Sequence, residues 1–175
     1  MLSALTLAHT PGVTRTTWAL LLTASIGPAV LGLGNEVQET DPAQYADVAR
    51  RMLVSGDWLH LHDQNGPFYN KPPLTMWLQA AGMAVFGVDA LAVRLPGLLF
   101  AVITMVSTFL IGRVLADEKR GLTAAALVGA SLSTHLMVLD PKVDTSLTAM
   151  TSLAIALMLL GRTRPWLRLA AWAVA

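Results

Sequence analysis

Long apolar runs recur along the chain, separated by short polar segments and, in one place, by a long polar stretch. A helix needs roughly 20 apolar residues, at about 1.5 Å of rise per residue, to cross the hydrocarbon core of a bilayer. The pattern predicts transmembrane spans over about residues 17–33, 90–115, 122–139, 145–160 and 166–175, the last of them partial. Residues 74–86 are apolar but too few to span, and we expect them to form a helix at the interface or among other helices.

The polar stretch begins a loop, residues 35–89, whose first half has the periodicity of an amphipathic helix. The apolar face of this helix is formed by Tyr45, Val48, Ala49, Met52 and Leu53. Asp41 is a suitable N-cap, Pro42 suits the first helical position, and Gly56 suits the end. We therefore predict a short helix over residues 42–53.

The composition indicates a membrane protein. Hydrophobic residues make up 54% of the chain and charged residues 13%, and so small a charged fraction cannot cover the surface of a soluble domain. We predict an all-α fold, a polytopic transmembrane helical bundle with short amphipathic interfacial helices in the first outer loop. The chain has no cysteine, which excludes a disulfide framework, a thiolate nucleophile and a cysteine zinc site. It has no basic patch with interleaved aromatic residues, so we predict no nucleic acid partner.

Charge is divided unevenly between the two sets of loops. One set holds Arg15, Arg113, Lys119, Arg120, Arg162, Arg164 and Arg168, with only Asp117 and Glu118 as acidic residues. The other nine carboxylates all fall in residues 35–89 and 139–144, which the spans place on the opposite side. Because short basic loops remain in the cytoplasm, we predict a multi-pass protein of the plasma (inner) membrane with a cytoplasmic N-terminus. Asp41 and Asp144, distant in sequence, are then both extracytoplasmic.

Several ionisable residues of the first outer loop are candidates for a site, and each also has a structural explanation. Asp41 can be a helix cap and nothing more. Lys71 precedes two prolines and can be an interfacial anchor whose ammonium reaches water. His60 and His62 alternate, which in an extended segment puts both on one face, but two histidines without a third ligand are weak evidence for a metal site.

Asp140 and Asp144 flank Lys142 at the junction of two predicted spans. Helix caps and ion pairs are common at such junctions. Ionisable groups at a membrane boundary are costly, however, and often mark a functional site. Spacing alone leaves both explanations open.

Ordered motifs give a more specific signal than any of these residues alone. They are residues 39–53, Ser55-Gly56-Asp57-Trp58, Phe68-Tyr69-Asn70-Lys71-Pro72-Pro73-Leu74, Trp77-Leu78, Phe86-Gly87-Val88, Ala92-Val93-Arg94-Leu95-Pro96, and Asp144 before Leu147-Thr148. In this order, over residues 35–160, they resemble the start of a GT-C membrane glycosyltransferase. Within that superfamily they resemble family 39, which includes the aminoarabinose transferases that act on lipid A and the protein O-mannosyltransferases.

The resemblance implies roles that spacing alone does not. It implies catalytic roles for Asp41 and Asp144, donor-phosphate binding by Lys71, Arg94 and Lys142, and substrate binding by Tyr45, Tyr69 and Asp140. Asp41 matches the family aspartate thought to take a proton from the acceptor, while Pro42 replaces a family glutamate. The family sequence Glu-Lys-Pro-Pro is Asn70-Lys71-Pro72-Pro73 here, so a carboxylate that binds metal in some members is missing. We therefore assign no metal ligand, and the sequence identifies no cofactor.

These roles predict an enzyme that moves a sugar from a polyprenyl-phosphate donor to a hydroxyl or phosphate acceptor at the outer face of the membrane. The acceptor would be a lipid, a glycan or a protein, and membrane lipids would surround the donor chain. Family members are several hundred residues long, so we expect residues 1–175 to be the N-terminal portion of a GT-C transmembrane domain. The alternative is a truncated, non-catalytic membrane protein, such as a transporter fragment or a lipid-binding scaffold.

Overall fold

The computed structural model describes residues 14–33, 40–140, 142–162 and 166–174. The helices in this part of the chain are α1 (Arg15–Leu31), α2 (Thr40–Ser55), α3 (Leu74–Phe86), α4 (Ala90–Leu115), α5 (Glu118–Ala130), α6 (Leu132–Leu139), α7 (Val143–Leu160) and α8 (Trp166–Val174). Two strands, β1 (His62–Asp63) and β2 (Gly66–Pro67), pair antiparallel in a hairpin. The predicted all-α class is confirmed, because each strand has only two residues.

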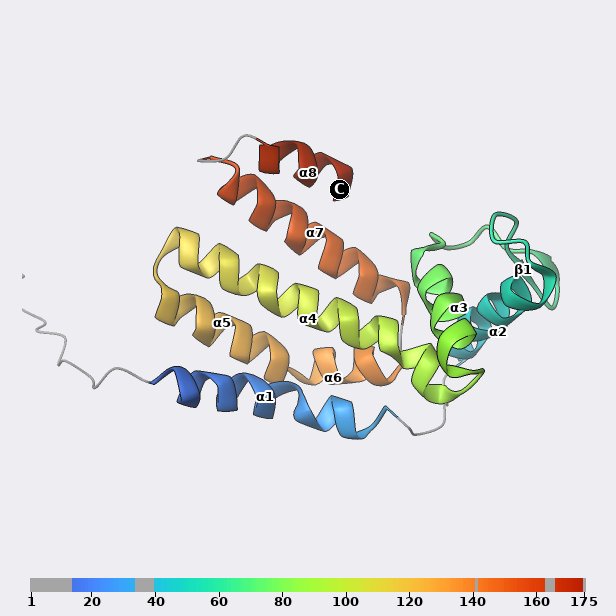
Figure 1. The fold of residues 1–175 in the computed structure, drawn as a ribbon, viewed down its shortest axis with the longest axis horizontal. Helices are drawn as coiled ribbons and strands as arrows, with labels where there is room; N and C mark the ends of the chain where they lie inside the picture. Colours follow the sequence, from blue (N-terminus) through green and yellow to red (C-terminus); the bar gives the residue numbers. More distant parts are fainter. Residues whose placement is uncertain (1–13, 34–39, 141, 163–165, 175) are drawn as a thin grey trace, which may run out of the picture.

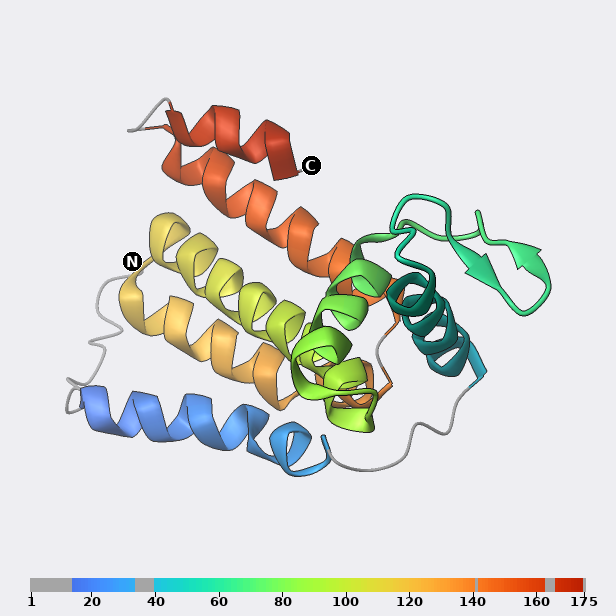
Figure 2. The same cartoon turned by 45° about the vertical axis from the view of Figure 1, so that its right-hand side comes forward.

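The long helices lie in a layer with α4 at its centre (Figure 1). α5 and α7 pack against α4 from opposite sides, α1 packs against α5 and α6, and α8 packs against α7. Helices that follow each other in sequence, α4 with α5 and α7 with α8, run in opposite directions, so their connections alternate between two ends (Figure 1). The packed neighbours α4 and α7 run in the same direction, as do α1 and α5. α2, α3 and the hairpin gather at one end, beside the start of α7 (Figures 1 and 2). We call this the capped end, and it comprises residues 40–89, 140 and 142–144.

The membrane spans agree with the hydropathy pattern in two places and differ in a third. α4 and α7 are long and apolar enough to cross a membrane. α5 and α6 can together form a third span, but they meet at an angle of 53°. The segment predicted as a span over residues 122–139 is therefore made of two helices joined by a bend. The apolar part of α1, Trp18–Leu31, is shorter than these spans, and the described part of α8 has nine residues.

The break between α5 and α6 is made by Ser131, whose side chain replaces interrupted backbone hydrogen bonds. Its hydroxyl donates to the Val128 carbonyl at 2.8 Å and accepts from the Thr134 amide at 3.3 Å. Thr134 Oγ1 donates to the same carbonyl at 2.7 Å. Hydroxyl side chains can satisfy backbone groups in this way at membrane depth, where lipid offers no partner. An average of hydropathy over the whole span does not register the break, because apolar residues on both sides outnumber the short polar group Ser131, Ser133, Thr134 and His135.

α4 and α5 approach each other closely at Gly112 and Gly121. A Cβ on Gly112 would lie 2.7 Å from the Cα of Gly121, and a Cβ on Gly121 would lie 2.6 Å from the carbonyl oxygen of Phe109. Small residues allow helix backbones in membranes to approach in this way. The contact sets the spacing of the two helices at the end opposite the capped end.

The capped end has an apolar core of its own. It is formed by Tyr45, Val48, Ala49, Met52, Leu61, Phe68, Met76, Ala80, Met83, Ala92, Val93 and Val143. Gln44 Nε2 donates to Asp63 Oδ2 at 2.8 Å, which fastens the hairpin to α2. Trp77 Nε1 donates to the Trp58 carbonyl at 2.7 Å, which fastens the segment after α2 to α3. The predicted apolar face of α2 is confirmed, since its residues are buried in this core, Leu53 only partly.

The two ends of α2 test the predicted start and stop signals. The helix begins at Thr40, two residues before the predicted start, so Asp41 lies within the first turn and its prediction as the N-cap was wrong. A carboxylate in the first turn is still favoured by the partial positive charge of a helix N-terminus. Gly56 follows the last helical residue with a φ of 74°. This left-handed conformation favours glycine, and the predicted end of the helix is confirmed.

Candidate functional site

Buried Tyr45 marks the point where charged groups from distant parts of the chain converge. It is 3% exposed, and its ring packs edge-on against Phe68 with 6.3 Å between the ring centroids. Burial raises the pKa of the Tyr45 phenol, the charges of Asp41 and Asp144 raise it further, and the charge of Lys142 lowers it. Two carboxylates and an ammonium therefore lie within electrostatic reach of one phenol, which keeps its proton at neutral pH.

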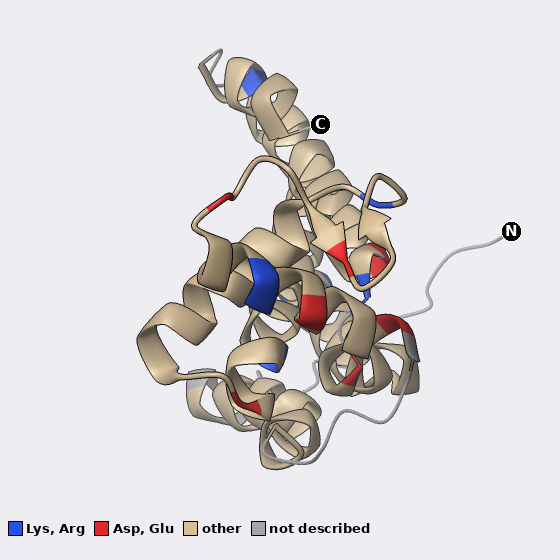
Figure 3. Cartoon of the chain, turned by 90° about the vertical axis from the view of Figure 1, so that its right-hand side faces the viewer, with Lys and Arg blue, Asp and Glu red and all other residues tan. Residues whose placement is uncertain are grey.

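Asp41 and Asp144 approach Tyr45 from the first turns of two helices, α2 and α7. Both side chains are exposed. The two helices are separated in sequence by α3 to α6, yet Val143 of α7 packs into the same apolar core as Tyr45. Figure 3 looks onto the capped end and shows acidic and basic segments there. The fold thus brings together two of the residues that the sequence assigns to the site.

Asp140 and Lys142 lie in a pocket of about 420 Å³ along α6. The other residues that line it are Leu132, Ser133, Leu136 and Met137. α6 ends at the capped end, where Asp140 follows its last residue. The pocket therefore has charged groups at its outer end and a mainly apolar wall that continues along the span.

Arg94 joins three helix ends through backbone carbonyls. It is 2% exposed, near the start of α4. Its Nε donates to the Leu139 carbonyl at 2.5 Å, and its Nη1 donates to the carbonyls of Leu33 and Gly32 at 3.2 and 3.4 Å. These contacts connect the C-terminal ends of α1 and α6 to α4. The structure thus gives Arg94 a structural role, while its assignment to the donor phosphate stays a prediction.

Lys71 and Tyr69 lie in the segment between β2 and α3, together with Asn70, and all three are exposed. Among the described residues, no hydrogen bond or ion pair joins the Lys71 ammonium to another group. Lys71 therefore shares the capped end with Asp41 and Asp144 without touching either. The roles of Lys71 in donor binding and of Tyr69 in substrate binding stay predictions, as does that of Asp140.

Asp57, His60 and His62 order the loop that follows α2. The Asp57 carboxylate accepts from the amides of His60 and Leu59, each at 3.0 Å, and its Oδ2 lies 2.9 Å from His60 Nδ1. These hydrogen bonds, that from the His60 amide above all, lower the pKa of Asp57 to about 2. His62 Nδ1 lies 2.8 Å from the His60 carbonyl. Within the described ranges, no three His, Cys, Asp or Glu side chains are grouped so as to hold a metal ion.

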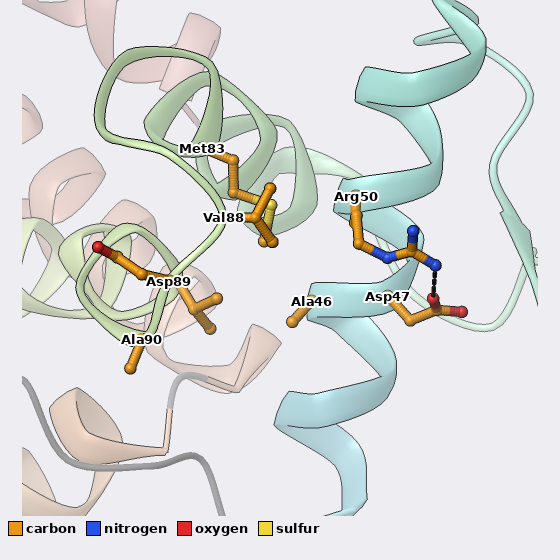
Figure 4. Close-up of a pocket in the computed structure, with 8 residues that line it drawn as sticks. Ala46, Asp47, Arg50, Met83, Val88, Asp89 and Ala90 are labelled. Atoms are coloured by element: carbon orange, nitrogen blue, oxygen red, sulfur yellow. Dashed lines mark hydrogen bonds and ion pairs between the residues drawn. The ribbon is translucent and has the colours of Figure 1, made fainter.

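A groove of about 530 Å³ lies between α2 and the turn that joins α3 to α4 (Figure 4). Met83 and Val88 give it an apolar wall. Arg50 and Asp47 border it from α2 and form an ion pair of 3.0 Å. The groove was not predicted from the sequence, because no motif connects the two segments that line it. None of the residues assigned to the site lines it either.

Residues 70–175 match the family described as dolichyl-phosphate-mannose-protein mannosyltransferase. The chain belongs to this family. The predicted resemblance to a GT-C glycosyltransferase of family 39 is thereby confirmed. Family membership accounts for the order of the motifs from residue 70 onward.

Two curated relatives share the description undecaprenyl phosphate-alpha-4-amino-4-deoxy-L-arabinose arabinosyl transferase. The chain is 32% identical over 118 residues to that of Pseudomonas paraeruginosa, covering 67% of this chain and 22% of the relative. It is 32% identical over 111 residues to that of Pseudomonas savastanoi pv. phaseolicola, covering 62% and 21%. The chain thus spans about a fifth of the length of the family members that it matches.

The fold is also similar to crystal structures of ArnT from Cupriavidus metallidurans. The apo structure has a TM-score of 0.82 at 23% identity, covering 91% of this chain and 31% of that chain. The structure bound to undecaprenyl phosphate has a TM-score of 0.76 at 24% identity, covering 92% and 31%. The arrangement of the described helices is therefore one that a solved protein shares.

Proposed function

We propose that this chain is part of a glycosyltransferase that moves a sugar from a polyprenyl phosphate to an acceptor at the outer face of the membrane. Family membership supports the class of reaction. The observation that carries the proposal is the convergence of Asp41, Asp144 and Lys142 on Tyr45. It gathers proton-accepting and cationic groups from two outer segments at one end of the bundle, which a transfer between two polar substrates requires.

The reaction is a single displacement at the anomeric carbon of the donor sugar. The acceptor oxygen attacks that carbon while the bond from the carbon to the phosphate oxygen breaks, and the phosphate leaves with the electron pair. Asp41 takes the proton that the acceptor hydroxyl loses. Attack and departure on opposite faces invert the sugar. Asp144 accepts hydrogen bonds from substrate hydroxyls and positions them for the attack.

Cationic groups stabilise the phosphate as it leaves. Lys142 lies beside an apolar pocket, and an ammonium next to an apolar wall suits the two parts of a polyprenyl phosphate, its charged head and its hydrocarbon chain. Lys71, exposed at the same end of the bundle, adds a second point charge. Tyr45 keeps its proton because its pKa is raised, so its hydroxyl is available as a hydrogen-bond donor to a substrate. Tyr69 and Asp140 contact the sugar.

A transfer assay with the full-length protein tests the proposal. Undecaprenyl-phosphate-linked 4-amino-4-deoxy-L-arabinose is the first donor to use, because the curated relatives carry it in their description and ArnT binds undecaprenyl phosphate. With lipid A as the acceptor, we expect release of undecaprenyl phosphate together with a sugar-modified acceptor. Donor binding without transfer to lipid, glycan or peptide acceptors would instead support the non-catalytic alternative, a lipid-binding scaffold.

We also propose that the capped end faces away from the cytoplasm. Basic residues Arg113, Lys119, Arg120, Arg162 and Arg168 lie at the opposite end of the bundle, where α4, α5, α7 and α8 begin or end, and such residues favour the cytoplasmic side. The chain contains no cysteine, so single introduced cysteines report their own positions.

In intact cells, cysteines placed by Gln64→Cys and Lys142→Cys should react with a membrane-impermeant maleimide. A cysteine placed by Lys119→Cys should react only after the membrane is permeabilised, which also serves as the control for its presence. Labelling of the Lys119→Cys protein alone, before permeabilisation, would reverse the orientation.

A further inference from the structure

A crevice lined by hydroxyl groups lies between α4, α6 and α7, within the segments that cross the membrane. Its volume is about 330 Å³, and seven of its ten lining residues are serine or threonine. Thr104 and Thr108 come from α4, while Thr148 and Ser152 come from α7. A lipid-facing surface has no use for so many hydroxyl groups, because hydrocarbon chains form no hydrogen bonds.

The hydroxyl protons of these four residues already have acceptors. Each hydroxyl donates to the carbonyl four residues earlier in its own helix, at distances between 2.7 and 2.9 Å. The oxygen atoms keep lone pairs that can accept. A molecule that pairs with this wall must therefore donate hydrogen bonds.

Thr145 gives an independent indication of a ligand. It is 4% exposed, it lines the crevice, and its Oγ1 has no hydrogen-bond partner among the described residues. A buried hydroxyl without a partner is costly, and native proteins usually satisfy such a group with ordered water. The crevice thus combines an acceptor-rich wall with an unpaired buried hydroxyl.

The crevice begins at the capped end. Thr145 follows the exposed Asp144 in the first turn of α7, and Ser152 lies about two turns deeper in the span. The other face of α4 is different. There, a pocket of about 450 Å³ that includes Val106 is lined by apolar residues apart from Thr23. The cavity that α4 lines with several hydroxyl groups is therefore the one that leads to Asp144.

We propose that water fills this crevice and carries hydration from the capped end toward the middle of the bundle. Water donates two hydrogen bonds and accepts others, so it can pair Thr145 Oγ1 and bridge the acceptor oxygens. Since one molecule takes about 30 Å³, the crevice has room for several. Polar surface at membrane depth is stable where it lines a water-filled cavity. The inference concerns solvent alone and does not depend on the glycosyltransferase reaction.

Cysteine reactivity in the full-length protein, kept in its native membrane, tests the proposal. Thr104→Cys and Ser152→Cys place thiols in the crevice. Val106→Cys places a thiol on another face of α4 at nearly the depth of Thr104, and Leu147→Cys places one on another face of α7, nearer the capped end than Ser152. These two residues are the more exposed, at 49% and 66%. The probe is a positively charged methanethiosulfonate, which reacts with thiolate in water and is excluded from hydrocarbon.

The crevice thiols should react at least about tenfold faster than the two controls, because only they contact water. The exposed fractions of the side chains, which take no account of lipid, predict instead that the two controls react faster. The order of the reaction rates therefore separates contact with water from simple exposure. Equal rates at crevice and control positions would overturn the proposal, whether lipid or another helix fills the crevice. If the Thr104→Cys or the Ser152→Cys variant fails to fold, Thr108→Cys takes its place as the crevice thiol. Labelling after denaturation confirms that each thiol is present. Labelling needs no turnover, so a failed transfer assay leaves this result unaffected.

Discussion

The Asp41→Asn variant of the full-length protein is expected to transfer sugar roughly 10² to 10⁴ times more slowly than the wild type. Asparagine keeps the size of the side chain and its ability to accept hydrogen bonds, but it does not take a proton from the acceptor. Asp41 is exposed in the first turn of α2 and does not cap the helix. Its structural contribution is therefore an interaction with the helix dipole, worth about 0.3–1 kcal/mol, which is too small to account for such a loss.

Asp47→Asn is the matched control for this experiment. Asp47 lies on the same helix, but its carboxylate pairs with Arg50 and Arg51 at 3.0 and 2.7 Å and borders the groove of Figure 4. The control should transfer sugar at close to the wild-type rate. Initial rates of transfer from a polyprenyl-phosphate donor, with equal amounts of inserted protein, give the comparison. Near-normal turnover by Asp41→Asn would return Asp41 to a purely structural role.

The Arg94→Met variant is expected to lose roughly 2–5 kcal/mol of stability. Methionine can occupy much of the buried volume but donates no hydrogen bond, so the carbonyls of Gly32, Leu33 and Leu139 lose their charged donor. Two of these carbonyls lie at the C-terminal end of α1, and the third lies at the C-terminal end of α6. Their release also loosens the connection that carries Lys142 and Asp144 to the capped end.

Thermal unfolding in detergent, followed by tryptophan fluorescence, measures this loss. Arg113→Met makes the same substitution at the exposed, opposite end of α4 and should leave the unfolding temperature nearly unchanged. Should Arg94→Met unfold at the wild-type temperature and lose only affinity for the phosphate donor, the structural role of Arg94 would be rejected in favour of the phosphate-binding assignment.

Hydropathy and helix signals predicted most of the fold because its elements are continuous apolar segments bounded by polar residues. The structure gives α3 as Leu74–Phe86 and α4 as Ala90–Leu115, in agreement with the predicted ranges. The break at Ser131 could not be predicted in this way. It depends on which carbonyl a hydroxyl reaches in three dimensions, and one serine hardly changes the mean hydropathy of a span.

The candidate site was predictable only where topology decides the outcome. The predicted spans alternate in direction, so the sequence places Asp41 and Asp144 on the same side of the membrane. Their proximity could be expected from that alone. The contacts of Arg94 follow from no motif, because its acceptors are backbone carbonyls, which every residue has. The distance from Lys71 to the carboxylates depends on the path of the hairpin, which the family resemblance does not specify.

The close contact between α4 and α5 has a consequence for the order of folding. The two helices are joined by only Ala116 and Asp117, so their packing at Gly112 and Gly121 closes a short loop at little cost in chain entropy. Such local contacts form early. The meeting of α2 with the start of α7 closes a far longer loop and comes later. Under the proposed function, a nascent chain that is already inserted in the bilayer is still inactive. It does not act on the lipid-linked sugar until α2 and the start of α7 have come together.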